Sequence, residues 1–252
     1  MKFRLPLTCL LLGLIGAARG ADPSYGVVVS PDASLLRRDG NDLGTILAGD
    51  GFRGRVQQVY DASFFSFLPS GGGWIDSVSF RGDRTTPGTR TYIGDGVRVQ
   101  LSTTSAKTDA LSPVFSSNLG LDTKIVIDKE TRLVIANGQG DGLTDPFATA
   151  FVFFDKPFFF NPQSGNLLID ISFYKDIPMA PYDAETVMGD SVSSVSAFSL
   201  NTGQVPTVGT PTTLGFVTAF TYHPVPEPSA LVLGALGLGL ALTRRRKAPS
   251  PL

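Results

Sequence analysis

The sequence predicts an all-β protein, an antiparallel β-sandwich of jelly-roll type. At least eight short segments of alternating or wholly apolar residues are separated by turns, and the 252 residues include 28 glycines and 18 prolines. These segments lack the apolar spacing of an amphipathic helix. Aspartate far outnumbers glutamate, as expected where carboxylates lie in turns. No repeat of fixed period is present, which disfavours a propeller or a β-helix.

The front of the body, residues 21–54, is a polar, glycine-rich lead-in, and we expect at most one strand in it, at residues 27–29. The β-sandwich domain is expected to cover residues 55–223. Its first strand is predicted at residues 56–62, and an aromatic turn follows at residues 64–68.

The next strand, residues 74–81, should place Trp74, Val78 and Phe80 on one face. A buried aromatic ring contributes a large apolar area. We therefore expect Trp74 and Tyr60 to fill the core.

Residues 96–102 and 167–174 alternate clearly between apolar and polar side chains, which predicts strands with one face on the core and one in solvent. The side chains expected to face the core are Val97, Val99, Leu101, Ile169, Ile171 and Phe173. Residues 192–198 and 214–222 are predicted to form the last two strands.

Residues 123–128 and 131–135 flank a polar turn at residues 128–130, which predicts a β-hairpin. Residues 148–154 and 158–160 are apolar on both faces, which predicts an inner strand and its approach to a loop.

The first twenty residues predict a secretory signal peptide, residues 1–20. A basic start with Lys2 and Arg4 precedes a short apolar stretch, and small residues precede Ala21. The one cysteine, Cys9, lies within this segment, so the exported chain has no disulfide and depends on core burial or bound ions.

The last thirty residues contain three elements in a fixed order. The first is the stiff segment Val225, Pro226, Glu227 and Pro228, and the second is an uncharged run at residues 229–243. This run predicts a single short transmembrane helix of roughly 22 Å, less than the ~30 Å hydrocarbon thickness of a bilayer. The third element is a basic cluster that should remain on the cytoplasmic side, formed by Arg244, Arg245, Arg246 and Lys247.

This tail, residues 224–252, resembles the PEP-CTERM sorting signal of Gram-negative bacteria. The resemblance implies export by the Sec translocon, transient residence in the inner membrane and recognition by an exosortase. It also implies removal of the helix, and delivery to the cell surface or to the extracellular polysaccharide matrix of a biofilm. An ordinary single-pass anchor is the alternative.

The body also resembles a cargo domain that precedes this tail in other PEP-CTERM proteins. The matching segments are residues 57–61 (QQVYD), 101–105 (LSTTS) and 189–193 (GDSVS). This second resemblance brings no assigned activity.

Without both processed ends, residues 21–226 keep 14 of 21 Lys and Arg residues and 21 of 22 Asp and Glu residues, which leaves a formal charge of −7. This acidic balance disfavours binding to nucleic acid or to anionic lipid, because both depend on basic surfaces.

Few residues have the chemistry of a catalytic or metal site. His223 is the only histidine and lies at the start of the stalk, so we expect no catalytic residue and no zinc site. A glycosidase would need only two carboxylates, and Glu130 and Glu185 are candidates on predicted loops. Calcium is the one cofactor that the composition suggests, with Asn137, Asp141 and Asp145 as weak ligand candidates in a glycine-rich turn.

Two tyrosines on predicted polar loops, Tyr92 and Tyr182, are candidates for the rim of a ligand site, since exposed rings can stack on sugars. The sequence therefore favours an exported, non-enzymatic structural or adhesive protein. A carbohydrate-binding module on the same fold and a secreted glycoside-active enzyme are the two alternatives. A surface polysaccharide is the expected ligand partner.

Overall fold

The computed structural model describes residues 26–30, 42–45, 52–66, 68–81, 90–130, 133–137, 151–175, 181–186, 191–200 and 204–225. The body, Tyr25–Pro224, forms one compact unit. The predicted signal peptide and the predicted sorting helix with its basic cluster lie outside the described residues. Within those ranges, no helix is long and apolar enough to cross a membrane.

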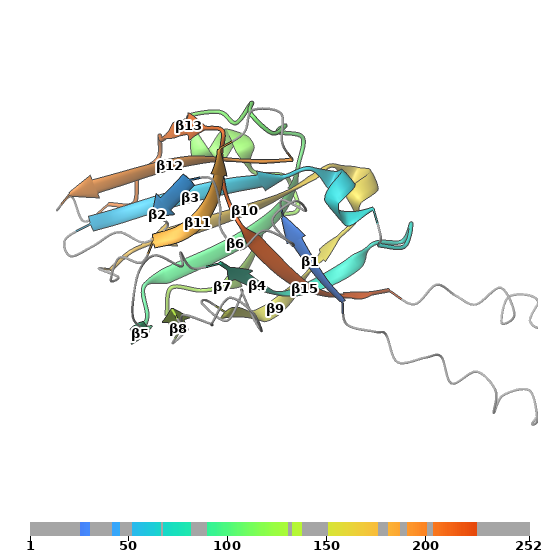
Figure 1. Cartoon of the computed structure of the whole chain (residues 1–252), viewed down its shortest axis with the longest axis horizontal. Helices are drawn as coiled ribbons and strands as arrows, with labels where there is room; N and C mark the ends of the chain where they lie inside the picture. Colours follow the sequence, from blue (N-terminus) through green and yellow to red (C-terminus); the bar gives the residue numbers. More distant parts are fainter. Residues whose placement is uncertain are drawn as a thin grey trace, which may run out of the picture. The chain divides into compact units, whose positions relative to one another are not determined.

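The body is built from antiparallel strands in two main sheets, which can be followed in Figure 1. One sheet has six strands in the order β13 (Thr210–Thr212), β12 (Val192–Leu200), β3 (Phe52–Tyr60), β10 (Asn166–Phe173), β6 (Val97–Thr104) and β7 (Lys124–Ile127). The other has four, in the order β1 (Gly26–Ser30), β15 (Thr218–Pro224), β4 (Gly73–Phe80) and β9 (Phe151–Phe160).

Two small sheets complete the described strands. One has the order β14 (Leu214–Phe216), β11 (Pro181–Thr186) and β2 (Asp42–Thr45), and the other pairs β5 (Arg90–Gly94) with β8 (Leu133–Asn137). The helical residues described are three short 3-10 turns, η2 (Ala62–Phe65), η3 (Phe115–Asn118) and η4 (Pro162–Ser164). The predicted all-β, antiparallel, sandwich-like class is confirmed.

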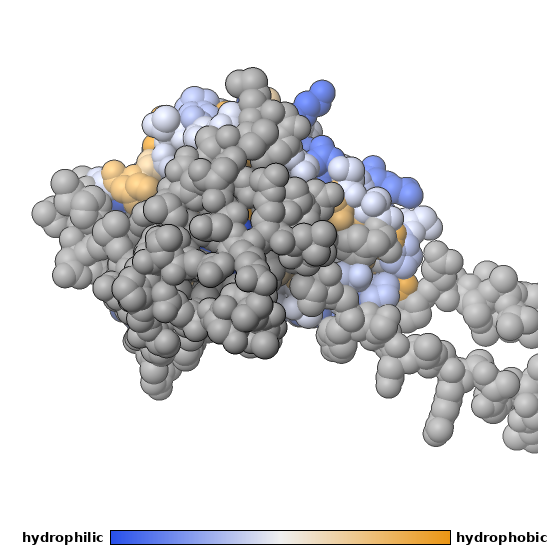
Figure 2. Space-filling view, viewed as in Figure 1, coloured by the Kyte–Doolittle hydropathy of each residue, from blue (hydrophilic) through white to orange (hydrophobic). Residues whose placement is uncertain are grey.

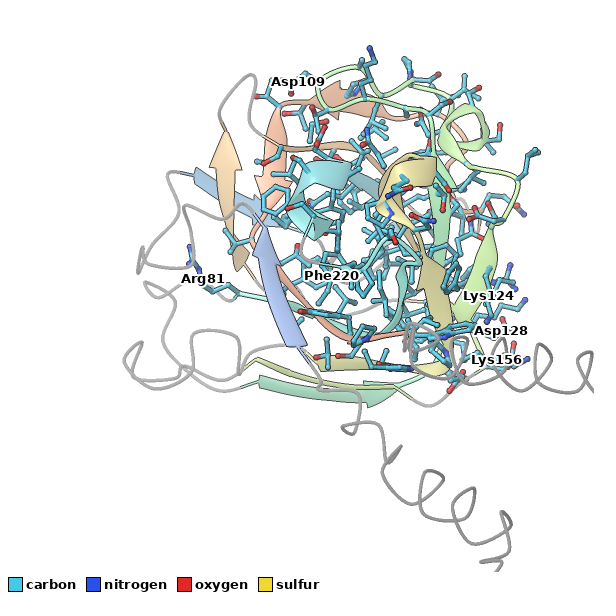
Figure 3. The ribbon with its side chains drawn as sticks, turned by 90° about the vertical axis from the view of Figure 1, so that its right-hand side faces the viewer. Arg81, Asp109, Lys124, Asp128, Lys156 and Phe220 are labelled. Atoms are coloured by element: carbon cyan, nitrogen blue, oxygen red, sulfur yellow. The ribbon has the colours of Figure 1, made fainter. Side chains whose placement is uncertain are left out.

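The hydrophobic core lies between the two main sheets. The six side chains of β6 and β10 that the alternation assigned to the core are all buried there, as predicted. Phe220 of β15 occupies the centre, where its ring meets Tyr60 edge-on with 4.8 Å between centroids (Figure 3). The expectation that Tyr60 fills the core is also confirmed.

The other face of the six-stranded sheet is covered rather than solvated, which corrects the prediction of a half-exposed strand. The segment between β6 and β7 crosses this face and packs a second apolar cluster of Val59, Leu111, Phe115, Leu168 and Val195 against it. Ser102 and Thr104 of β6 are buried beneath the segment. Alternation identified the inner face correctly but could not show that a loop covers the outer one.

The prediction of a β-hairpin across residues 128–130 is wrong. β7 pairs with β6, whereas β8 pairs with β5 in a separate sheet. The carbonyl of Lys129 accepts a hydrogen bond from the amide of Gly96, so this turn is joined to the start of β6. Val126 and Ile127 enter the core, and their burial holds β7 in the six-stranded sheet.

Three further strand predictions need correction. The lead-in contributes two strands, because β1 pairs with β15 and β2 pairs with β11. The predicted last strand divides at Val217 into β14 and β15, which belong to different sheets. The predicted inner strand, β9, is the last strand of its sheet and pairs there only with β4 among the described strands.

Gly120 is required by a close approach of two backbones. A Cβ atom at this position would lie 1.7 Å from the carbonyl oxygen of Thr103, whereas one at Gly71 would meet nothing within 4 Å. We expect Gly120→Ala to lower the free energy of unfolding by about 1–3 kcal/mol, because the covering segment must shift away from β6. Gly71→Ala is the matched control and should change it by less than about 0.5 kcal/mol. Urea unfolding of both variants measures the difference, and equal values would contradict the packing argument.

Candidate functional site

A row of three side chains crosses the outer face of the four-stranded sheet. Trp74 of β4 lies directly opposite Phe159 of β9 on one side and His223 of β15 on the other. Directly opposed residues of antiparallel strands share a face. The neighbouring row, Ile75 and Phe158, faces the core, so the first row faces outward.

Asp76 joins this row through an irregularity in the sheet. The register of β4 shifts between Ile75 and Ser77 against β9, and the register of β15 shifts between Thr221 and Tyr222 against β4. Asp76 is therefore the extra residue of a bulge, and bulges redirect side chains. Its carboxylate lies 2.7 Å from Nδ1 of His223, which orients the imidazole ring.

The aromatic pair forms a corner rather than a flat platform. The Trp74 and Phe159 rings have centroids 5.3 Å apart and an interplanar angle of 65°. The Phe159 side chain is 39% exposed and Trp74 is half-buried. Nζ of Lys124, from the neighbouring β7, stands 5.8 Å from the centre of the Trp74 ring and donates a hydrogen bond to the carbonyl of Pro157. We call Trp74, Phe159, His223, Asp76 and Lys124 together the Trp74 surface.

Charges of both signs lie on the side of the body that carries Lys124 (Figure 3). Lys124, Asp128 and Lys156 are on the same side of the sandwich, away from the central Phe220 (Figure 3). Hydrogen bonds from the Arg98 guanidinium and from the Lys129 amide hold the pKa of the Asp128 carboxyl below its usual value. The described surface in Figure 2 is mainly hydrophilic, with small separate hydrophobic spots.

The structure corrects the placement of the predicted aromatic residues. Trp74 was expected in the core but faces outward, because the bulge at Asp76 changes which side chains of β4 share a face. Tyr92 and Tyr182 were expected on loops, yet they lie in β5 and β11, in two different sheets. Phe159 was missed. The available signal was the alternation of side chains along a strand. If Phe158 and Phe160 face the core, Phe159 between them must face outward.

The structure describes three of the five predicted calcium-ligand and acid/base candidates. Asn137 ends β8, whereas Asp141 and Asp145 lie outside the described ranges. No group of three His, Cys, Asp or Glu side chains in those ranges could hold a metal ion. Glu130 follows β7 in an exposed turn, and Glu185 lies in β11 rather than in the predicted loop.

The most buried carboxylate of the described sheets, Asp170 of β10, is fully engaged in structure. It is 1% exposed and accepts hydrogen bonds from Nε and Nη2 of Arg55 at 3.0 and 2.6 Å. The side-chain amides of Gln57 and Gln100 donate to it at 2.8 and 2.9 Å. Both oxygens of this carboxylate are therefore occupied by hydrogen bonds to neighbouring side chains.

This network also holds the segment that covers the six-stranded sheet. Gln57 donates to the carbonyl of Phe115, and Asn118 donates to the amide oxygen of Gln57. The Arg55 guanidinium lies 4.8 Å from the centre of the Phe115 ring. The Asp170 network therefore clamps η3 against the six-stranded sheet.

A second buried network joins the two main sheets through the core. The Tyr60 hydroxyl accepts from the Gln58 amide at 2.7 Å and donates to Thr218 Oγ1 at 2.9 Å. Thr218 donates to the Phe216 carbonyl, and the Phe216 amide donates back to Gln58 at 2.8 Å. Burial in the core raises the pKa of the Tyr60 phenol above its usual value.

The raised pKa of Tyr60 predicts a loss of stability in alkali. Above about pH 10 the unfolded chain releases a phenol proton that the folded chain keeps, so ionisation favours unfolding. The stabilisation is complete below about pH 10 and falls as the pH rises further. Urea unfolding between pH 8 and 11 should show a shallower decline for Tyr60→Phe than for the unaltered protein. An unchanged slope in the variant would contradict this assignment.

Comparisons of this chain with protein-family models, with curated proteins and with solved structures found no match.

Proposed function

We propose that this protein is an exported, non-enzymatic structural or adhesive component of the cell surface or extracellular matrix, sorted by an exosortase. The Sec translocon would export the chain, and the helix at residues 229–243 would hold it in the inner membrane until processing. The observation that carries the proposal is the fixed order of Val225 to Pro228, the uncharged run and the basic cluster at Arg244 to Lys247.

The end of the last strand supports this reading. β15 stays paired with β4 as far as Pro224, which lies opposite Gly73, and the sorting motif begins at the next residue. An enzyme that reads Pro226 to Pro228 would therefore find the motif directly after the folded body. The jelly-roll assignment belongs to the same proposal, and the order β1, β15, β4 and β9 agrees with it, because the last strand lies between the first strand and β4.

Mass spectrometry of the exported protein tests the sorting step. In cells that contain the exosortase, we expect the mature chain to begin at Ala21 and to end near Pro228. In cells without it, the chain should extend to Leu252 and remain in the membrane fraction. Glu227→Ala should reproduce the second result, whereas Glu130→Ala, a matched change in an exposed turn of the body, should not. A C-terminus at Leu252 in both strains would end the proposal.

Carbohydrate binding is a second candidate function, and the Trp74 surface favours it. A partly exposed aromatic pair beside a carboxylate, an imidazole and an ammonium group is a chemical composition that suits a hydroxyl-rich ligand. This function is compatible with the first, because an adhesive protein of a polysaccharide matrix needs a place to hold the polymer.

A further inference from the structure

We propose that the Trp74 surface binds a pyranose ring of an extracellular polysaccharide, with the Phe159 ring as the principal contact. The proposal rests on the exported destination for the choice of ligand and on the geometry of β4, β9 and β15 for the site. It assigns the ligand contact to residues other than Tyr92 and Tyr182, which lie in separate small sheets.

The exposure of Phe159 is the first step of the argument. The two flanking phenylalanines of β9, Phe158 and Phe160, are 2% and 0% exposed, whereas Phe159 is 39% exposed. Pairing with β4 holds the Phe159 backbone opposite Trp74, so the ring cannot turn into the core without breaking the register. The sheet therefore presents this ring to the outside.

The shape of the aromatic corner selects the kind of ligand. One face of a pyranose carries C–H groups of slight positive charge, and these pack against the negative face of an aromatic ring. Two rings at 65° can contact the face and one edge of a single sugar ring, whereas a flat crystalline array would need coplanar rings. The corner therefore fits one residue of a soluble or gel-like chain.

The polar groups around the corner match the hydroxyl groups at the rim of a sugar. Asp76 accepts hydrogen bonds, and its contact with Nδ1 fixes the orientation of the His223 ring beside Trp74. Lys124 adds a cation beside the indole. A carboxylate and an ammonium group flanking the same two rings disfavour a purely apolar partner, because both charges would lose water without gaining partners. A second copy of this chain is the competing occupant.

The single tryptophan of the chain makes the site directly observable. The full chain in a detergent without a sugar head group is titrated with cellohexaose and, separately, with oligogalacturonate, while the emission of Trp74 is followed. We expect a saturable change in intensity or wavelength with at least one of the two probes. Because this preparation does not depend on the exosortase, its outcome is independent of the sorting experiment.

Matched variants test the residues. Phe159→Ala should weaken binding about tenfold, which corresponds to about 1.4 kcal/mol, the upper end of what an aromatic contact contributes. Phe198→Ala, at a position of β12 that is 41% exposed, should leave affinity unchanged. Circular dichroism of both variants must match that of the unaltered chain, which shows that they fold. Lys124→Met provides a second test, because it removes the ammonium group and leaves the apolar stem of the side chain in place.

Three results would overturn the proposal. They are the absence of any emission change with both probes, equal affinity of Phe159→Ala and the unaltered chain, and a concentration-dependent dimer that Phe159→Ala abolishes. The third would assign the surface to self-association, and sedimentation of the same samples detects it.

Discussion

Replacing Asp170 by alanine is expected to lower the free energy of unfolding by about 3–5 kcal/mol, because it breaks a buried ion pair and leaves the other charge uncompensated. Arg55 has only 15% of its side chain exposed and would lose both hydrogen bonds to the carboxylate. Gln57 and Gln100 would each lose an acceptor. Urea unfolding followed by circular dichroism gives the difference.

The matched control for Asp170→Ala is Asp128→Ala. Asp128 also accepts from an arginine, Arg98, at 3.0 Å, but its side chain is 53% exposed. Exposed ion pairs contribute little to stability, so Asp128→Ala should change the free energy of unfolding far less than Asp170→Ala does. Asp170→Asn should fall between the two, since it keeps the volume but turns one acceptor into a donor facing other donors. Equal effects of Asp170→Ala and Asp128→Ala would contradict the assignment of Asp170 as a structural clamp.

Phe220→Ala should have an effect of similar size, about 3–5 kcal/mol, through loss of buried area and creation of a cavity. The ring is fully buried at the centre of the sandwich (Figure 3) and contacts Tyr60 and Phe65, with centroids 4.8 and 5.7 Å away. β15 is also the strand that leads into Val225 to Pro228, the proposed sorting motif. We therefore expect this variant to unfold at lower urea and, if the proposed sorting holds, to reach the surface in smaller amounts.

Phe198→Ala is the control for Phe220→Ala, because its ring is 41% exposed and less burial is lost. It should lower the free energy of unfolding by less than about 1.5 kcal/mol. A Phe220→Ala variant as stable as this control would mean that the core does not depend on the contact between β15 and β3.

Local pattern predicted the strands whose two faces differ. In β6 and β10 every second residue is apolar, so alternation alone identified the six core side chains. The polar face of that pattern was misjudged, because the segment that buries Ser102 is held over the sheet by packing against β3, β10 and β12, which are distant from it in sequence. Burial of a strand face by a loop depends on contacts between distant parts of the chain. The periodicity within a single strand carries no information about such contacts.

Pairing was the least predictable property of the fold. The turn at residues 128–130 has hairpin composition, yet β7 and β8 enter different sheets because Val126 and Ile127 are buried against the core. The Trp74 surface was unpredictable for a related reason. The bulge at Asp76 reversed the expected orientation of Trp74, and neither Phe159 nor His223 is near Trp74 in sequence.

Composition, periodicity and the ordered tail by themselves determined that this chain is an all-β protein and made an exported destination the expectation, because these properties depend on residues close together in the chain. Only the tertiary structure decided which strands pair, which carboxylate is buried and which aromatic ring remains outside. These features depend on contacts such as Arg55 with Asp170 and Trp74 with Phe159, and only the packing of the two sheets brings those residues together.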